Sequence, residues 1–118
     1  MPYFCVSVQG FTPLERQADD YIVRKQRPGA FIGTSLDDTL RQRDVTQIFL
    51  SGNATSLGVE STGRSAYDYG YNVVFVTDAM ADRDAESHEY SVEKTFLRFG
   101  ETAITDEVLK MLKESAPR

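Results

Sequence analysis

Residues 51–62, which read SGNATSLGVEST, have the composition of a turn that could hold a reactive group. An apolar run over residues 48–50 precedes them and a helical pattern follows them. Backbone N–H groups at the start of a helix can bind an anion, so chemistry is expected here. The turn contains no cysteine, lysine or histidine, so any such group must come from elsewhere in the chain.

Five side chains are candidates for chemistry. Thr55 and Ser56 could be nucleophiles, but no base is visible beside them, and helix capping is the favoured role. Cys5 could be a thiol nucleophile, although no cation or helix start is beside it and a packed strand residue is favoured. His88 could be a base or ligand, but its apolar helix stripe favours a structural histidine with one satisfied nitrogen. Lys25 could be a catalytic or anion-holding cation, and a solvated lysine at a strand end is an equal alternative.

Composition narrows the class of protein. The 118 residues fit one domain spanning residues 1–118, and 41% hydrophobic residues are enough for a core. A net charge of −5 without a run of basic residues disfavours nucleic acid as a partner. No apolar run approaches the roughly 20 residues of a membrane span, so no membrane association is expected. The single cysteine cannot form an internal disulfide, which fits a cytoplasmic location.

Cofactor and metal motifs are not apparent. The glycines of the turn match neither GxGxxG nor GxxxxGK[ST], so no nucleotide or other cofactor is expected. No cluster of His, Cys and Asp has the spacing of metal ligands, so no metal site is expected.

The hydrophobic pattern predicts an α/β fold. Strands are expected at residues 3–8, 20–25, 47–51, 72–77 and 102–104. Helices are expected at residues 35–43 after a Thr34 cap, at 57–69, at 84–99, and at 105–113 after a Thr105 cap. This alternation indicates a mainly parallel sheet with helices on both faces. Ligands of such sheets bind at the carboxyl ends of the strands, which here places residues 25–28, 51–56 and 78–80 on the functional rim.

The helix after the turn is expected to lie close against the sheet. Val59, Gly63 and Ala66 fall on one of its faces, and two of the three are small. Glycine inside a helix costs about 1 kcal/mol relative to alanine, so a close approach is the expected reason for Gly63.

Three segments together resemble a known family. They are KQRPGAFIGTSLDDTLR (25–41), SGNATSLGVESTGRSA (51–66) and GYNVVFVTDAM (70–80). The ordered set resembles the isochorismatase-like, or cysteine hydrolase, family, which includes nicotinamidases and N-carbamoylsarcosine amidases. The resemblance covers about residues 19–112. It implies a doubly wound, Rossmann-like three-layer fold and hydrolysis of a small amide or vinyl ether by an Asp, a Lys and a Cys.

The resemblance also implies a site. Lys25 matches the family lysine, and Gly58 stands where the nucleophilic cysteine would stand. The implied substrate or oxyanion site comprises Asn53, Ala54, Thr55 and Leu57. The Asn53–Ala54 bond matches a position that is often cis. Gly58 has no side chain, so thiol catalysis at that position is impossible; a branch of the family reads T-S-[LI]-G-V-E-S-T, which makes this glycine a branch feature.

The family's first strand, with its acidic residue, has no counterpart before Lys25. The chain is therefore expected to be short at its N-terminus by about one βαβ unit of roughly 30 residues. The strand at residues 3–8 is expected to fill part of that gap, or else the sheet keeps an open edge that favours pairing with another chain. A homo-oligomer is expected.

Three functions stay open at this point. The first is a hydrolase-like domain, which without the thiol would use activated water. The second is a non-catalytic relative that forms oligomers or binds a small anion through Lys25 and the backbone of the turn. The third is an inactive truncated product.

Overall fold

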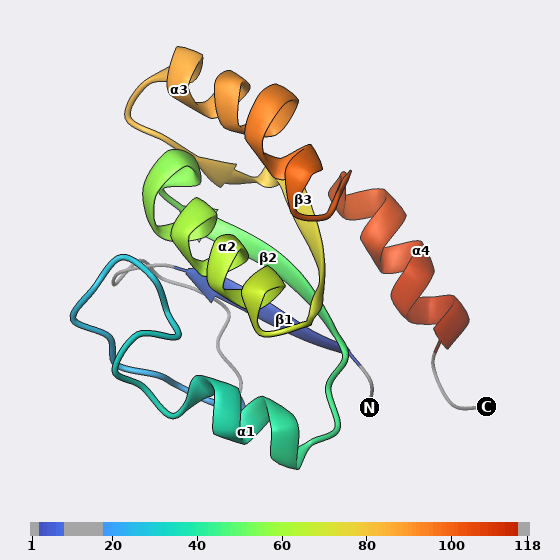
Figure 1. The fold of residues 1–118 in the computed structure, drawn as a ribbon. Coiled ribbons are helices and arrows are strands. Elements are labelled where there is room, and N and C mark those ends of the chain that lie inside the picture. The colour runs from blue at the N-terminus through green and yellow to red at the C-terminus, as the bar shows by residue number, and fades with distance from the viewer. Residues whose placement is uncertain (1–2, 9–17, 116–118) are drawn as a thin grey trace.

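The computed structural model describes residues 3–8 and 18–115, which form an α/β fold (Figure 1). Four strands make one sheet in the order β1-β2-β3-β4, and every neighbouring pair is parallel. The strands are β1 (Tyr3–Val8), β2 (Gln47–Asn53), β3 (Asn72–Ala81) and β4 (Glu101–Ala103). The predicted parallel sheet is confirmed, and β2 and β3 continue beyond their predicted carboxyl ends.

Strand β1 takes a full place in the sheet. It pairs with β2 over all six of its residues, from Tyr3 opposite Gln47 to Val8 opposite Gly52. This pairing agrees with the prediction that residues 3–8 fill a position in the sheet. Because β1 is first in the strand order, its other side pairs with no strand among residues 3–8 and 18–115, so an edge is present as well.

The helices alternate with the strands. They are α1 (Leu36–Gln42), α2 (Glu60–Asp68), α3 (Ala85–Tyr90) and α4 (Thr105–Ser115). A π-helical turn (Thr55–Val59) leads into α2, and α3 continues through a π-helical segment (Ser91–Thr95) and a final 3-10 turn (Phe96–Arg98). The helix predicted at residues 84–99 is thus present, capped by Asp84, whose carboxylate accepts the Glu86 N–H.

The helices cover both faces of the sheet. Residues of β2 and β3 that point to one face join the core formed with α1, α2 and the end of the α3 helix, and this core includes Leu40, Ile48, Ala66, Phe75 and Phe96. Residues that point to the other face pack against α4, and this smaller core includes Phe49, Val74, Val76, Ala103 and Val108. The three-layer arrangement follows from strands that are apolar on both faces.

Helix α2 lies close to the sheet at Gly63, as predicted. A Cβ atom at Gly63 would lie 2.5 Å from the ring of Phe75, closer than real Cβ atoms approach. The Phe75 ring is fully buried and stacks on Phe96 with a centroid distance of 3.9 Å. The absence of a side chain at Gly63 is therefore what lets the helix and the strand pack at this distance.

The strand predicted at residues 20–25 is wrong. These residues have no regular secondary structure, and Ile22 is 55% exposed, while Tyr21 and Val23 pack partly against the larger core. The physical reason is that these two side chains gain burial by packing against the larger core, without pairing to a sheet edge. Thr34 accepts the Leu36 N–H at 3.3 Å, in agreement with its predicted capping role, although α1 begins one residue later than expected.

Candidate functional site

The turn after β2 lies at the carboxyl end of the sheet. The peptide bond between Asn53 and Ala54 is cis, as the family resemblance implied, and Gly52 has a φ of 122°. The chain then forms the π-helical turn, in which Gly58 is buried. The position of the expected nucleophile is thus inside the turn that joins β2 to α2.

Several backbone N–H groups of the turn already donate hydrogen bonds to other groups of the protein. The Leu57 and Val59 N–H groups both donate to the Ala54 carbonyl at 3.1 Å. The Ser56 N–H donates to the Asp82 carboxylate at 2.7 Å. Leu57 was expected to offer its N–H to an oxyanion, but this group instead closes the turn.

Ser56 is held by Asp82, which comes directly after β3. The Ser56 hydroxyl donates to Asp82 Oδ2 at 2.5 Å, the same oxygen that accepts the Ser56 N–H. The Arg83 N–H donates to the other oxygen at 2.7 Å. The hydrogen bond from the Ser56 hydroxyl is the main cause that lowers the pKa of Asp82, and backbone N–H bonds add to it. A carboxylate with a lowered pKa is a poor base, so this pair fixes the turn rather than activating Ser56.

Thr55 is held by His88 of α3. Thr55 is fully buried, and its hydroxyl shares a hydrogen bond of 2.7 Å with His88 Nδ1. One ring nitrogen of His88 is thus satisfied, as predicted. The predicted capping role of Thr55 and Ser56 is wrong. Their hydroxyl groups contact residues 33 and 26 positions away, respectively, rather than the start of their own helix.

Lys25 lies on a loop that packs near the start of α2. Its Nζ atom donates to the Arg27 carbonyl at 3.2 Å, and the residue is half-buried. Slightly further along this loop, the Ala30 N–H donates to the buried Thr62 hydroxyl at 3.0 Å. The loop is thereby fixed to α2, but the hydrogen bond made by Lys25 is within the loop itself.

Asp78, the other polar rim residue, has a structural contact. Its Oδ1 atom accepts the N–H and the hydroxyl of Thr105 at 2.7 Å each, which ties β3 to the start of α4. The bond from the Thr105 hydroxyl is the main cause that lowers the pKa of Asp78. Thr105 was expected to cap α4 with its own side chain; instead its hydroxyl donates to Asp78, and Glu107 accepts the Ile104 N–H at 3.0 Å.

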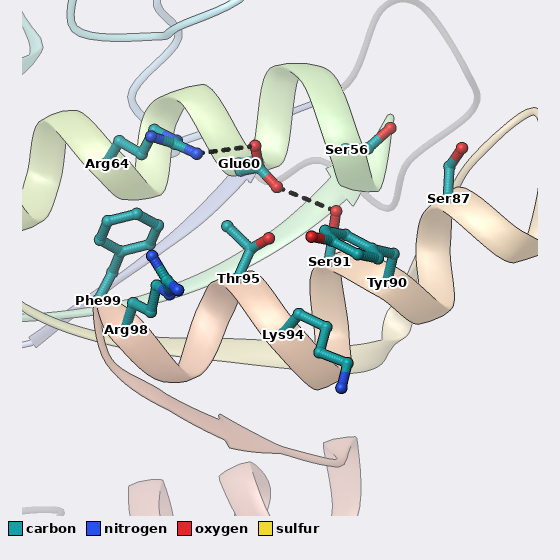
Figure 2. Close-up of a pocket in the computed structure, with 10 residues that line it drawn as sticks. All are labelled: Ser56, Glu60, Arg64, Ser87, Tyr90, Ser91, Lys94, Thr95, Arg98 and Phe99. Carbon is teal, nitrogen blue, oxygen red and sulfur yellow. Dashed lines mark hydrogen bonds and ion pairs between the residues drawn. The ribbon is translucent and has the colours of Figure 1, made fainter.

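A groove of about 690 Å³ begins at Ser56 and runs between α2 and the α3 helix as far as Phe99 (Figure 2). Arg64 lies on one wall, and Lys94 and Arg98 lie on the other. Sequence reasoning missed both this groove and Asp82. The available signal was topological, because Asp82 and the turn follow the carboxyl ends of neighbouring parallel strands.

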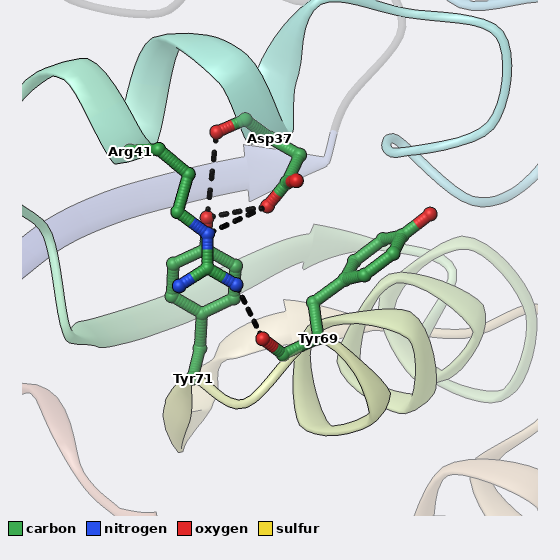
Figure 3. Close-up of polar contacts among 4 residues, drawn as sticks. All are labelled: Asp37, Arg41, Tyr69 and Tyr71. Atoms are coloured by element: carbon green, nitrogen blue, oxygen red, sulfur yellow. Dashed lines mark hydrogen bonds and ion pairs between the residues drawn. The ribbon is translucent and has the colours of Figure 1, made fainter.

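A second polar cluster, at the amino end of β3, joins α1 to the end of α2 (Figure 3). The Tyr71 hydroxyl donates to Asp37 Oδ1 at 2.6 Å, and the Arg41 guanidinium lies 4.4 Å from the centre of the Tyr71 ring. Arg41 also donates to the Tyr69 carbonyl and pairs with Asp37 at 3.4 Å. Burial is the main cause that raises the pKa of Tyr71, so its phenol stays neutral and acts as a donor. The cluster links structural elements and lies away from the candidate turn.

The described residues form neither a metal cluster nor a membrane-spanning helix. Residues 3–8 and 18–115 contain no group of three or more His, Cys, Asp or Glu side chains arranged to hold a metal ion. Within the same ranges, no helix has both the length and the apolar character needed to span a membrane.

Comparison with known proteins relates the turn to a family. Residues 8–107 match the model of the isochorismatase domain. The chain is 45% identical over 97 residues to an uncharacterised isochorismatase family protein of Bacillus subtilis, which covers 82% of this chain and 51% of that protein. It is 32% identical to a ureidoacrylate amidohydrolase of Agrobacterium fabrum, over 88% of this chain and 46% of that enzyme.

A solved structure agrees with these matches. An isochorismatase family protein from Burkholderia thailandensis superposes with a TM-score of 0.82 at 40% identity, covering 84% of this chain and 52% of that one. The chain thus spans about half the length of the curated relatives it matches.

Proposed function

Because the chain belongs to the isochorismatase family, we propose that it is a hydrolase-like domain that binds a small amide or vinyl ether at the turn after β2. The observation that supports this proposal is the turn that joins β2 to α2, in which Gly58 is buried. We assign Gly58 to the position of the family's nucleophile. The substrate-binding groups would be the backbone of Asn53, Ala54 and Thr55. One relative is a ureidoacrylate amidohydrolase, which supports the amide class.

The nucleophile of the proposed reaction is water. Gly58 offers no thiol, the Thr55 hydroxyl is buried against His88, and the Ser56 hydroxyl is held by a poor base. The proposed role of Lys25, which lies on the loop fixed to the start of α2, is to hold negative charge that develops on the substrate. In that role the Lys25 ammonium exchanges its Arg27 carbonyl partner for the substrate oxygen.

A second candidate function is binding without turnover. It is favoured by one specific observation, which is that Asp82, the carboxylate bonded to Ser56 of the turn, has a lowered pKa and accepts hydrogen bonds at both of its oxygens. A general base works best with a pKa near the operating pH, so this carboxylate suits an anchor better than a catalyst.

A substrate panel with one variant tests the two candidates. The 118-residue chain is incubated with simple amides, ureidoacrylate and isochorismate, and product formation is followed by chromatography. The variant is Lys25→Ala. The matched control is Lys110→Ala, which removes the same charge from an exposed position of α4, on the other face of the sheet.

Turnover that falls at least tenfold in Lys25→Ala and persists in Lys110→Ala supports the proposed hydrolase. Equal turnover in both variants overturns the role of Lys25. Saturable binding of a panel member without product, measured by calorimetry, favours the second candidate. If the chain shows neither turnover nor binding, both candidate functions are contradicted.

A further inference from the structure

The groove between α2 and the α3 helix has a surplus of positive charge. Arg64, Lys94 and Arg98 line it together with a single carboxylate, that of Glu60, in a chain whose net charge is −5. The groove is therefore lined by three cationic side chains and one carboxylate, although the protein as a whole carries a net negative charge. Figure 2 shows these side chains along the two helices that form the walls.

The one carboxylate of the groove is already engaged. Glu60 Oε1 accepts the hydroxyl of the buried Ser91 at 3.0 Å, and Oε2 faces the Arg64 guanidinium at 3.5 Å. Arg64 is in turn fixed over the Phe99 ring, 4.9 Å from its centre. Glu60 thus offsets much of the charge of Arg64. Lys94 and Arg98, one helical turn apart, lie on the other wall of the groove.

The groove also offers an aromatic face, because the Tyr90 ring lines the wall and is 65% exposed. The hydroxyl groups of Ser56 and Ser87 lie at the end near the turn, where they donate to the carboxylates of Asp82 and Asp84. A volume of about 690 Å³ is in the range of small-molecule sites and is larger than a single phosphate or carboxylate needs.

From this arrangement we propose that the groove is a binding site for a small molecule that carries one or more oxyanion groups, either carboxylates or phosphates. Lys94 and Arg98 bind the charged end, and the serine hydroxyls near the turn, which donate to Asp82 and Asp84, are not ligands. Charge-assisted hydrogen bonds of this kind are the strong ones at polar sites. The proposal goes beyond the proposed hydrolase activity and needs no turnover, although Ser56 is common to the groove and the turn.

The binding experiment uses the 118-residue chain and two defined probes. Citrate and inorganic phosphate are titrated separately at constant ionic strength, with sodium chloride as the balancing salt, while backbone amide signals are followed by NMR. We expect saturable shifts at the groove residues on both helices. Tighter binding of citrate identifies a polycarboxylate site, and tighter binding of phosphate identifies a phosphoryl site.

Matched variants locate the site. Lys94→Gln with Arg98→Gln is expected to weaken binding about tenfold, because two charge-assisted contacts at an exposed site are lost. Lys110→Gln with Lys113→Gln removes the same charge from exposed positions on α4 and is expected to change the affinity less than about twofold. Glu60→Gln removes the carboxylate that lines the groove and is expected to tighten binding.

Three outcomes overturn the proposal. The first is the absence of saturable shifts with either probe, and the second is an equal loss of affinity in the two double variants. The third is shifts confined to other parts of the chain. Circular dichroism of each variant verifies that it is folded, and because all four basic residues are exposed, folding is expected to be unaffected.

Discussion

Adding one methyl group at Gly63 tests how closely α2 packs on the sheet. Gly63→Ala has two opposing effects on the free energy of unfolding. Alanine stabilises a helix interior by about 1 kcal/mol relative to glycine. The new Cβ atom, however, would lie 2.5 Å from two ring carbons of Phe75, about 1 Å closer than an ordinary contact.

The surroundings decide which effect is larger. Phe75 and Phe96 are both fully buried, and their rings stack at 3.9 Å with only 2° between their planes. The Phe75 ring therefore has no free space to move into, and the helix itself must shift. Overpacking of this kind costs about 1–3 kcal/mol, and a contact this short belongs in the upper part of that range. The net expectation is a loss of about 1–2 kcal/mol.

Urea unfolding followed by circular dichroism measures this difference. Ser65→Ala, a half-buried position of the same helix, is the control, because it raises helix propensity and adds no atom. On a Phe75→Leu background, which removes the opposing ring, Gly63→Ala is expected to cost less or to stabilise. A Gly63→Ala variant as stable as the original chain would refute the reasoning.

Three further changes test the tethers described above. Thr55→Val leaves His88 Nδ1 without its partner and is expected to cost about 1–3 kcal/mol in urea unfolding, so an unchanged midpoint would contradict the tether. Asp82→Asn weakens the contact with Ser56. Since the folded pKa of Asp82 is lowered, its stabilisation is present above about pH 4 and is lost as pH falls through the folded pKa, so the stability gap to the variant should narrow in acid and not widen. Tyr71→Phe removes the bond to the α1 carboxylate and is expected to cost about 1 kcal/mol, whereas the same change at an exposed tyrosine should cost almost nothing.

Local pattern was enough to predict most of the fold. The runs that became β2 and β3 are apolar on both faces, and only a sheet covered by helices on both sides buries such strands. Gly63 was also informative, because a glycine inside a helix indicates that another element packs close to that helix. These signals are contained within a few neighbouring residues.

Residues 20–25 mark the limit of that reasoning. Their alternating pattern suits a strand, but a strand forms only where a segment lies alongside a sheet edge, and these residues pack against the larger core instead. Occupancy of the sheet is a property of the whole chain and is not contained in the local sequence. Tyr21 and Val23 still pack against the core, so the apolar pattern was correctly identified while its secondary structure was not.

In the turn after β2, the contacts that fix the backbone do not involve a side chain at position 58. Its hydroxyl groups at Thr55 and Ser56 looked like either nucleophiles or caps, and they are instead tethers to residues that follow β3. The tethers to His88 and Asp82, together with the hydrogen bonds inside the turn, use no side chain at Gly58. The shape of the turn therefore does not depend on a side chain at position 58, and a family member that has glycine here can keep the same turn.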